Sequence, residues 1–166
     1  MNSEKLYTEK VTSLRTGLLF LGLSALFAWL AFWKLQRIHS GALTGIFLLL
    51  TIMFLFYTLN YRTLVIEISK EEVTLRFGLF RWQIPLNTIA FCSRDTASLW
   101  RIGGAGIHFS FFNKRYRAMF NFLEHDRVVL GLNKKKGPVS EVAFSTTEPE
   151  RVMDIILSQI NQGETA

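Results

Sequence analysis

The stretch TGLLFLGLSALFAWLAFW, residues 16–33, contains eighteen residues without a charge and lies between Arg15 and Lys34. As an α-helix it measures about 27 Å, close to the thickness of the hydrocarbon core of a bilayer. A second uncharged stretch, GALTGIFLLLTIMFLFYTLNY at residues 41–61, ends before Arg62. Both stretches predict membrane-spanning helices. A cleaved signal peptide is the alternative for the first, but its apolar run is longer than a signal core and a second span follows directly.

Only seven residues, 34–40, join the two predicted helices. A connection this short predicts an antiparallel hairpin, so residues 1–15 and the chain after residue 61 lie on one side of the membrane. Basic residues near a membrane are enriched on its cytoplasmic side. Six of them flank the ends of the hairpin and two lie in its loop: Lys5, Lys10, Arg15, Arg62, Lys70 and Arg76, against Lys34 and Arg37. We therefore expect an integral protein of the inner (cytoplasmic) membrane, with both termini and the soluble domain in the cytoplasm.

Small and hydroxyl residues recur at helical spacing in both predicted helices. The first helix carries Gly17, Ser24, Ala28 and Ala31, and the second carries Thr44, Thr51 and Thr58, with Gly41 and Gly45 in GxxxG spacing. Such faces allow helices to approach closely, so we expect the two helices to pack against each other. Homodimerisation through the same faces is the alternative. Neither stretch contains Asp, Glu, Lys, Arg or His, which argues against a transporter or channel.

After residue 61 the hydrophobic period becomes that of a β-strand. Apolar and polar residues alternate at 63–68, 73–77, 127–132 and 141–145, and Gly, Pro and Asn residues separate the runs. Alternation of this kind predicts half-buried strands. About seven short strands joined by turns predict an antiparallel sandwich or barrel over residues 62–166.

The end of the chain predicts a helix over residues 148–161. Thr147 and Glu150 stand in capping-box spacing, and Pro149 suits a first helical turn. Apolar residues then follow helical spacing at Val152, Ile155, Ile156 and Ile160. A stripe of this kind is buried against the sheets, where it closes one end of a small barrel.

Three motifs resemble the bacterial PH-domain family: FGLFRWQIPLNTI at 77–89, RIGGAGI at 101–107 and FSTTEPERVMDII at 144–156. The resemblance covers residues 63–162 and implies a bent barrel of seven antiparallel strands with a C-terminal capping helix. The predicted fold is therefore an α+β membrane protein, in which a two-helix transmembrane hairpin precedes a PH-like antiparallel β-barrel and its capping helix. PH-like folds bind lipids, peptides or proteins, so the resemblance names no ligand.

The sequence predicts no catalytic, cofactor or metal site. The histidines, His39, His108 and His125, lack the spacing of metal ligands, and Cys92 is the sole cysteine. The glycine cluster at 103–106 lacks the Lys-Ser/Thr ending of a P-loop and predicts a loop or bulge. We therefore expect a protein that is not an enzyme.

Two basic clusters at predicted turns are candidates for contact with anionic lipid headgroups: Lys114, Arg115, Arg117, Lys134, Lys135 and Lys136. Close to a bilayer each surface Lys or Arg contributes about 1 kcal/mol. The alternative is that these residues keep hairpin tips soluble and discourage edge pairing. The first hairpin loop, at 69–72, has only Lys70 as a basic residue, unlike the phosphoinositide-binding members of the family.

Aromatic residues are dense between residues 107 and 122, and basic residues interrupt them. Stacking on single-stranded nucleic acid is one use of such a pattern. Alternating aromatics also fill barrel interiors, and a membrane tether argues against nucleic acid as a partner. Phe111 and Phe112 are adjacent and point to opposite faces of a strand, which leaves one ring for docking onto a partner or the membrane hairpin.

The net charge of +6 includes fourteen basic against eleven acidic residues after residue 60, typical of an ordinary solvated surface. We expect a non-enzymatic, membrane-anchored PH-like module that binds another protein, or assembles with itself, at the cytoplasmic face. The alternative function is an anionic-lipid surface sensor that uses the basic turn residues. No cofactor is expected.

Overall fold

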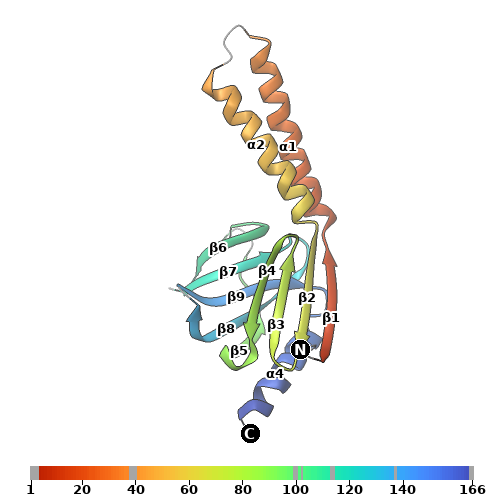
Figure 1. Ribbon diagram of the computed structural model, residues 1–166, viewed down its shortest axis with the longest axis vertical. Coiled ribbons are helices and arrows are strands. Elements are labelled where there is room, and N and C mark those ends of the chain that lie inside the picture. Colours follow the sequence, from red (N-terminus) through yellow and green to blue (C-terminus); the bar gives the residue numbers. More distant parts are fainter. Residues whose placement is uncertain are drawn as a thin grey trace.

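The computed structural model describes residues 4–37, 41–98, 101, 103–112, 115–136 and 138–164. Two β-sheets and a C-terminal helix form one domain, and two long helices project together from one end of it (Figure 1). The α+β arrangement that the sequence predicts is confirmed at this level.

The elements follow the chain in two groups, one that builds the helical hairpin with the first sheet and one that builds the second sheet with the terminal helix. The first group is β1 (Lys5–Thr12), α1 (Leu14–Leu35), α2 (Ala42–Asn60), β2 (Thr63–Ser69), β3 (Glu72–Phe77) and β4 (Phe80–Pro85). The second group is the 3₁₀ turn η1 (Leu86–Thr88), β5 (Ile89–Arg94), β6 (Gly106–Phe112), β7 (Arg115–Asn121), β8 (Asp126–Lys136), β9 (Val139–Thr146) and α4 (Pro149–Glu164).

Helices α1 and α2 occupy the two uncharged stretches, with ends that differ from the predicted ones by one or two residues. Ser13 begins α1 as its N-cap, because its hydroxyl oxygen accepts a 3.0 Å hydrogen bond from the amide of Thr16. Both helices have the length and apolar composition of helices that cross a membrane.

The segment before α1 is part of the first sheet, not a separate N-terminal segment as the predicted division at residue 15 implies. Strand β1 pairs antiparallel with β2, from Lys5 opposite Ser69 to Thr12 opposite Thr63. The helical hairpin is therefore inserted between two neighbouring strands. The sequence gives no local sign of this pairing, because the partner strand lies on the far side of the hairpin.

The first sheet has the order β1-β2-β3-β4, and the second has the order β5-β8-β9-β7-β6. The expectation of a purely antiparallel domain is wrong at one place, since β7 and β9 are parallel. The β8–β9 hairpin inserts β9 beside β7, whose other edge already pairs with β6. Within residues 62–166 the described chain forms eight strands where the sequence predicts about seven, and β1 adds a ninth; no strand pairing in the described chain joins the two sheets.

The hydrophobic core lies between the two sheets and beneath α4. Strands β2 and β3 bury every second residue there, and β7, β8 and β9 face them with Phe120, Leu130 and Phe144. Helix α4 adds Val152 and Ile156, both fully buried. The predicted helix at 148–161 is confirmed, and it packs against η1, β5 and β8.

Candidate functional site

Helices α1 and α2 pack along their length through aromatic rings and a few small residues. The rings of Phe27 and Phe54 stack nearly parallel with centroids 5.5 Å apart. Ser24 is buried in the same interface, and its hydroxyl donates a 3.1 Å hydrogen bond to the carbonyl of Thr51 on the other helix. The two helices therefore form one packed unit.

The structure places the predicted packing residues unevenly. Ser24, Ala31 and Thr44 are buried. Thr51 and Thr58 are half-buried, and their hydroxyls donate to the carbonyls of Phe47 and Phe54 in their own helix. The assignment of Gly17, Ala28, Gly41 and Gly45 to the packing face is wrong, since Ala28 is exposed and a Cβ on each of the three glycines would meet nothing within 4 Å. Aromatic rings make the contacts between the helices instead, among them Phe20, Phe27 and Phe54.

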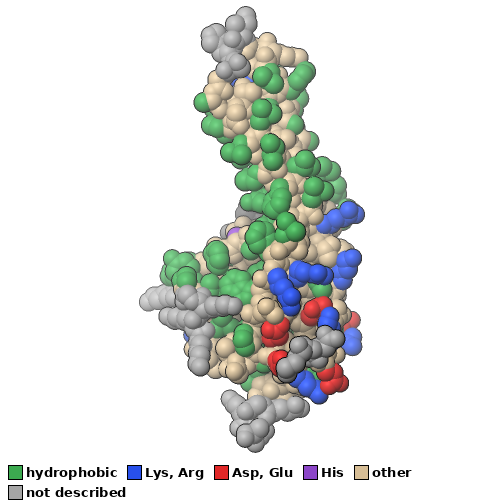
Figure 2. All heavy atoms as spheres, viewed as in Figure 1, with side chains coloured by type: hydrophobic (Ala, Val, Ile, Leu, Met, Phe, Trp, Pro, Cys, Tyr) green, Lys and Arg blue, Asp and Glu red, His purple; other side chains and the backbone are tan. Residues whose placement is uncertain are grey.

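Large apolar side chains are exposed along both helices of the hairpin. Hydrophobic side chains cover both helices, whereas charged side chains gather on the domain (Figure 2). Leu49, Ile52 and Leu59 are each about two-thirds or more exposed. An exposed apolar surface this large marks a contact with a membrane or another protein.

A chain of aromatic contacts joins the hairpin to the domain core. Phe20 and Tyr57 touch Tyr61 at the end of α2, and Tyr61 stacks on Phe77 in β3 with centroids 5.0 Å apart. Phe77 in turn packs edge-on against Phe122. The base of the hairpin is therefore continuous with the core.

Hydrogen bonds also join the base of the hairpin to the domain. The Glu124 carboxylate accepts hydrogen bonds of 3.1 and 3.2 Å from the amides of Leu14 and Arg15 in the first turn of α1. A carboxylate at this position also interacts favourably with the helix dipole. At the end of α2, the side-chain oxygen of Asn60 accepts a 2.8 Å bond from the amide of Leu79 in the β3–β4 turn.

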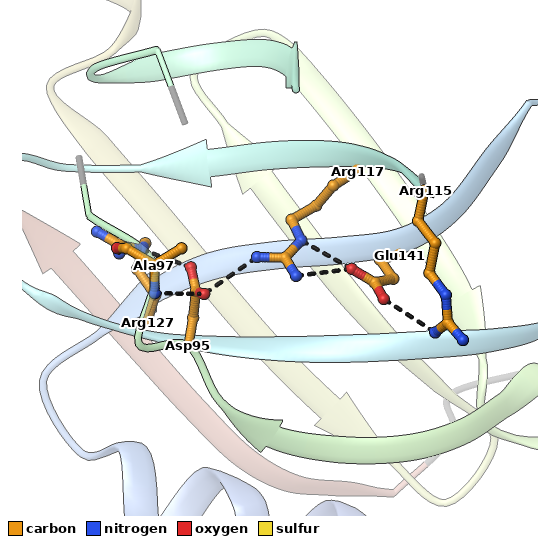
Figure 3. Close-up of polar contacts among 6 residues, drawn as sticks. All are labelled: Asp95, Ala97, Arg115, Arg117, Arg127 and Glu141. Atoms are coloured by element: carbon orange, nitrogen blue, oxygen red, sulfur yellow. Dashed lines mark hydrogen bonds and ion pairs between the residues drawn. The ribbon is translucent and has the colours of Figure 1, made fainter. Parts of the chain in front are cut away.

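A buried ion-pair network lies on the outer face of the second sheet (Figure 3). Arg117 lies between Asp95 and Glu141, with nitrogen-to-oxygen distances of 3.0 and 2.7 Å. Arg127 pairs with the other oxygen of Asp95 at 2.9 Å and donates to the carbonyl of Ala97. The network holds the segment after β5 across the sheet, which is a structural role.

The placement of Arg117 corrects the assignment of this residue to lipid headgroups, because a buried and paired guanidinium cannot reach a membrane surface. The side chain of Arg115 is about half exposed, and its guanidinium pairs with Glu141 at 3.0 Å. Lys114 lies outside the described residues, and so do the side chains of Lys134, Lys135 and Lys136.

The histidines do not converge on a site in the described part of the chain. The ring of His125 contacts the carbonyl of Thr12 at 2.9 Å, and His39 lies outside the described residues. No group of three His, Cys, Asp or Glu residues in the described chain has the arrangement of a metal site. Burial raises the pKa of the Cys92 thiol to about 12, which keeps it protonated and unreactive at neutral pH.

The domain end opposite the hairpin carries a groove of about 460 Å³. Apolar and polar side chains both line it: Pro85, Leu86, Ile89 and Ile160, with Lys70, Glu71, Asn87, Asn133 and Gln159. The β2–β3 turn, η1 and the last turns of α4 meet there. Sequence reasoning did not predict this groove, because it joins residues from four separated segments.

No protein-family model, curated protein or solved structure matches the chain.

Proposed function

We propose that this chain is a non-enzymatic, membrane-anchored binding module. Helices α1 and α2 span the inner membrane as a hairpin, and the β domain binds a protein partner, or a second copy, at the cytoplasmic face. One observation carries the proposal: the apolar hairpin is inserted between the paired strands β1 and β2, so both helices leave the domain at the same end.

The two-layer domain with a terminal helix, together with the three sequence motifs, supports a PH-like fold. The parallel pairing of β7 and β9 is a departure from an antiparallel barrel. We therefore propose that the domain resembles PH domains in its overall fold, and we infer no ligand from this resemblance.

The cytoplasmic orientation rests on basic residues beside the hairpin ends. Arg15, Arg62 and Lys10 lie close to the helix bases in sequence, and Arg15 and Arg62 are exposed. An alkaline phosphatase reporter at the carboxyl terminus tests this orientation. We expect low phosphatase activity, with a green fluorescent protein fusion at the same position bright; high phosphatase activity contradicts the proposal.

The groove at the far end of the domain is the proposed surface for the protein partner, because it faces away from the membrane. A photo-crosslinking residue at Asn87 in the groove and another at Thr8, which is exposed on β1, form a matched pair in native membranes. An adduct that forms from Asn87 and not from Thr8 supports the groove. Identical adducts from both positions, or none from Asn87, contradict it.

A further inference from the structure

The second sheet extends past the edge of the first, and its inner face is uncovered there. Phe109 and Phe111 in β6 lie directly opposite Ala118 and Tyr116 in β7 and so share their face of the sheet. Ala118 is buried in the core on that face, whereas Phe109 and Phe111 are 63% and 62% exposed. Among the described strands the first sheet ends at β4, and the exposure of both rings shows that the described chain leaves them uncovered.

Neighbouring residues enlarge this uncovered surface. The ring of Tyr116 packs on Phe111 with centroids 5.0 Å apart, and both remain largely exposed. Leu79 in the β3–β4 turn and Phe80, the first residue of β4, are also exposed. We call these five residues the aromatic edge: Leu79, Phe80, Phe109, Phe111 and Tyr116.

The aromatic edge is continuous with the base of the hairpin. A Cβ at Gly106, where β6 begins, would lie 3.3 Å from the ring of Tyr61 and 3.7 Å from that of Phe20. Phe80 packs near Tyr61 with centroids 6.3 Å apart. Strand β6 is the strand of its sheet nearest the helices and runs across their direction (Figure 1), and hydrophobic side chains continue from the helices onto this part of the domain (Figure 2).

The sequence that contains β6 and β7 carries no acidic residue. Residues 96–123 contain no Asp or Glu, and their basic residues other than the buried Arg117 are Arg101, Lys114 and Arg115. Aromatic side chains flanked by basic ones are typical of the interface between bilayer and water. A soluble partner would also cover the rings. The aromatic edge lies beside the domain-proximal ends of α1 and α2, however, and this position favours lipid as the partner.

We propose that the aromatic edge lies in the interfacial layer of the bilayer that α1 and α2 span. This inference rests on the proposed membrane anchor and adds a second contact to it. Two contacts fix the tilt of the domain, so that the groove at its far end points away from the membrane.

Depth-dependent fluorescence quenching of the full chain in liposomes tests the proposal. Single cysteines replace Phe109, Phe111, Ile52 on the outer surface of α2, or Asn87 in the far groove, and each carries a small fluorophore. Cys92 stays in place because its buried thiol does not react, and the unsubstituted chain reports residual labelling. The liposomes contain phosphatidylcholine and phosphatidylglycerol with a quencher either near the headgroup or deep in the acyl chains.

We expect the shallow quencher to reduce emission at Phe109→Cys and Phe111→Cys several-fold more than at Asn87→Cys. The deep quencher should act on Ile52→Cys. If Ile52→Cys is quenched but Phe109→Cys and Phe111→Cys are quenched no more than Asn87→Cys, the inference is overturned and the proposed membrane anchor is still supported. No quenching at Ile52→Cys overturns the anchor itself. Edge quenching that disappears as protein density in the liposomes rises shows that a second copy covers the edge, which also overturns the inference.

Discussion

Arg117 shows that a run of basic residues in the sequence does not reveal whether each side chain is exposed or paired with a distant acid. The sequence Lys-Arg-Tyr-Arg at 114–117 has the composition of a surface cluster. Arg117 is nevertheless buried, because Asp95 and Glu141 reach it from distant segments. Sequence reasoning places Arg115 and Arg117 at a turn, and it cannot supply these two carboxylates.

Removal of Arg117 should be costly, because the buried carboxylates of Asp95 and Glu141 each lose one of their two arginine partners and keep only Arg127 and Arg115. We expect Arg117→Ala to lower the free energy of unfolding by about 3–5 kcal/mol. Arg94→Ala is the matched control, since Arg94 is exposed and pairs with Asp126 and Glu150; it should cost about 0–1 kcal/mol. Denaturant unfolding of the detergent-solubilised chain, followed by tryptophan fluorescence, measures both. Equal losses contradict the buried network.

The thiol of Cys92 should make stability depend on alkaline pH. Its pKa rises from an ordinary 9.0 to about 12 on folding because of burial, so the folded state keeps a proton that the unfolded state loses. The contribution of the protonated Cys92 thiol to the free energy of unfolding is complete below pH 9.0 and is lost as pH rises toward about 12. The stability difference between the natural chain and Cys92→Ala should therefore shrink over this range. A difference that stays constant contradicts the assignment.

Among the elements, α1, α2 and α4 could be predicted because each has a strong local signal: long uncharged runs for the first two and a capping box for the third. Strand β1 could not, since Lys5, Glu9 and Lys10 interrupt its pattern and its partner follows the hairpin. The parallel position of β9 beside β7 depends on contacts between distant segments, which alternation does not encode.

The hairpin interface should tolerate little additional volume. Ser24→Leu removes the hydrogen bond to Thr51 and forces a larger side chain between the helices, at a cost of about 1–3 kcal/mol. Ala25→Leu adds a similar volume at a neighbouring exposed position and should leave stability nearly unchanged. Unfolding of the two variants in mixed micelles with increasing dodecyl sulfate compares them. Equal stability of the two variants would show that Ser24 does not face α2.

The junction of hairpin and domain should depend on Gly78. Its φ of +58° is strained for other residues, and a Cβ there would lie 2.2 Å from the backbone oxygen of Asn60. Gly78→Ala should therefore destabilise the fold by at least about 1–2 kcal/mol and lower the thermal midpoint of unfolding. Gly45→Ala, in open space on α2, should not lower it. Similar midpoints for the two variants contradict this contact.

At the scale of the whole molecule, the insertion of the hairpin between β1 and β2 decides how the domain is held. Helix α1 follows directly from β1 and α2 leads directly into β2 of the same sheet. Aromatic contacts run from Phe20 through Tyr61 to Phe77 in the core. The domain is therefore packed directly against its proposed anchor. A protein built this way presents one fixed end to the membrane and the opposite end, with its groove, to soluble partners.

The central claim is that α1 and α2 cross the membrane and return the chain to the side on which it began. Single cysteines at Gln36, at the end of α1, and at Thr8 and Asn87 in the domain test it directly. A membrane-impermeant maleimide applied to intact cells should label Gln36→Cys, and should label Thr8→Cys and Asn87→Cys only after permeabilisation. Labelling of Gln36→Cys and Asn87→Cys from the same side would contradict the account.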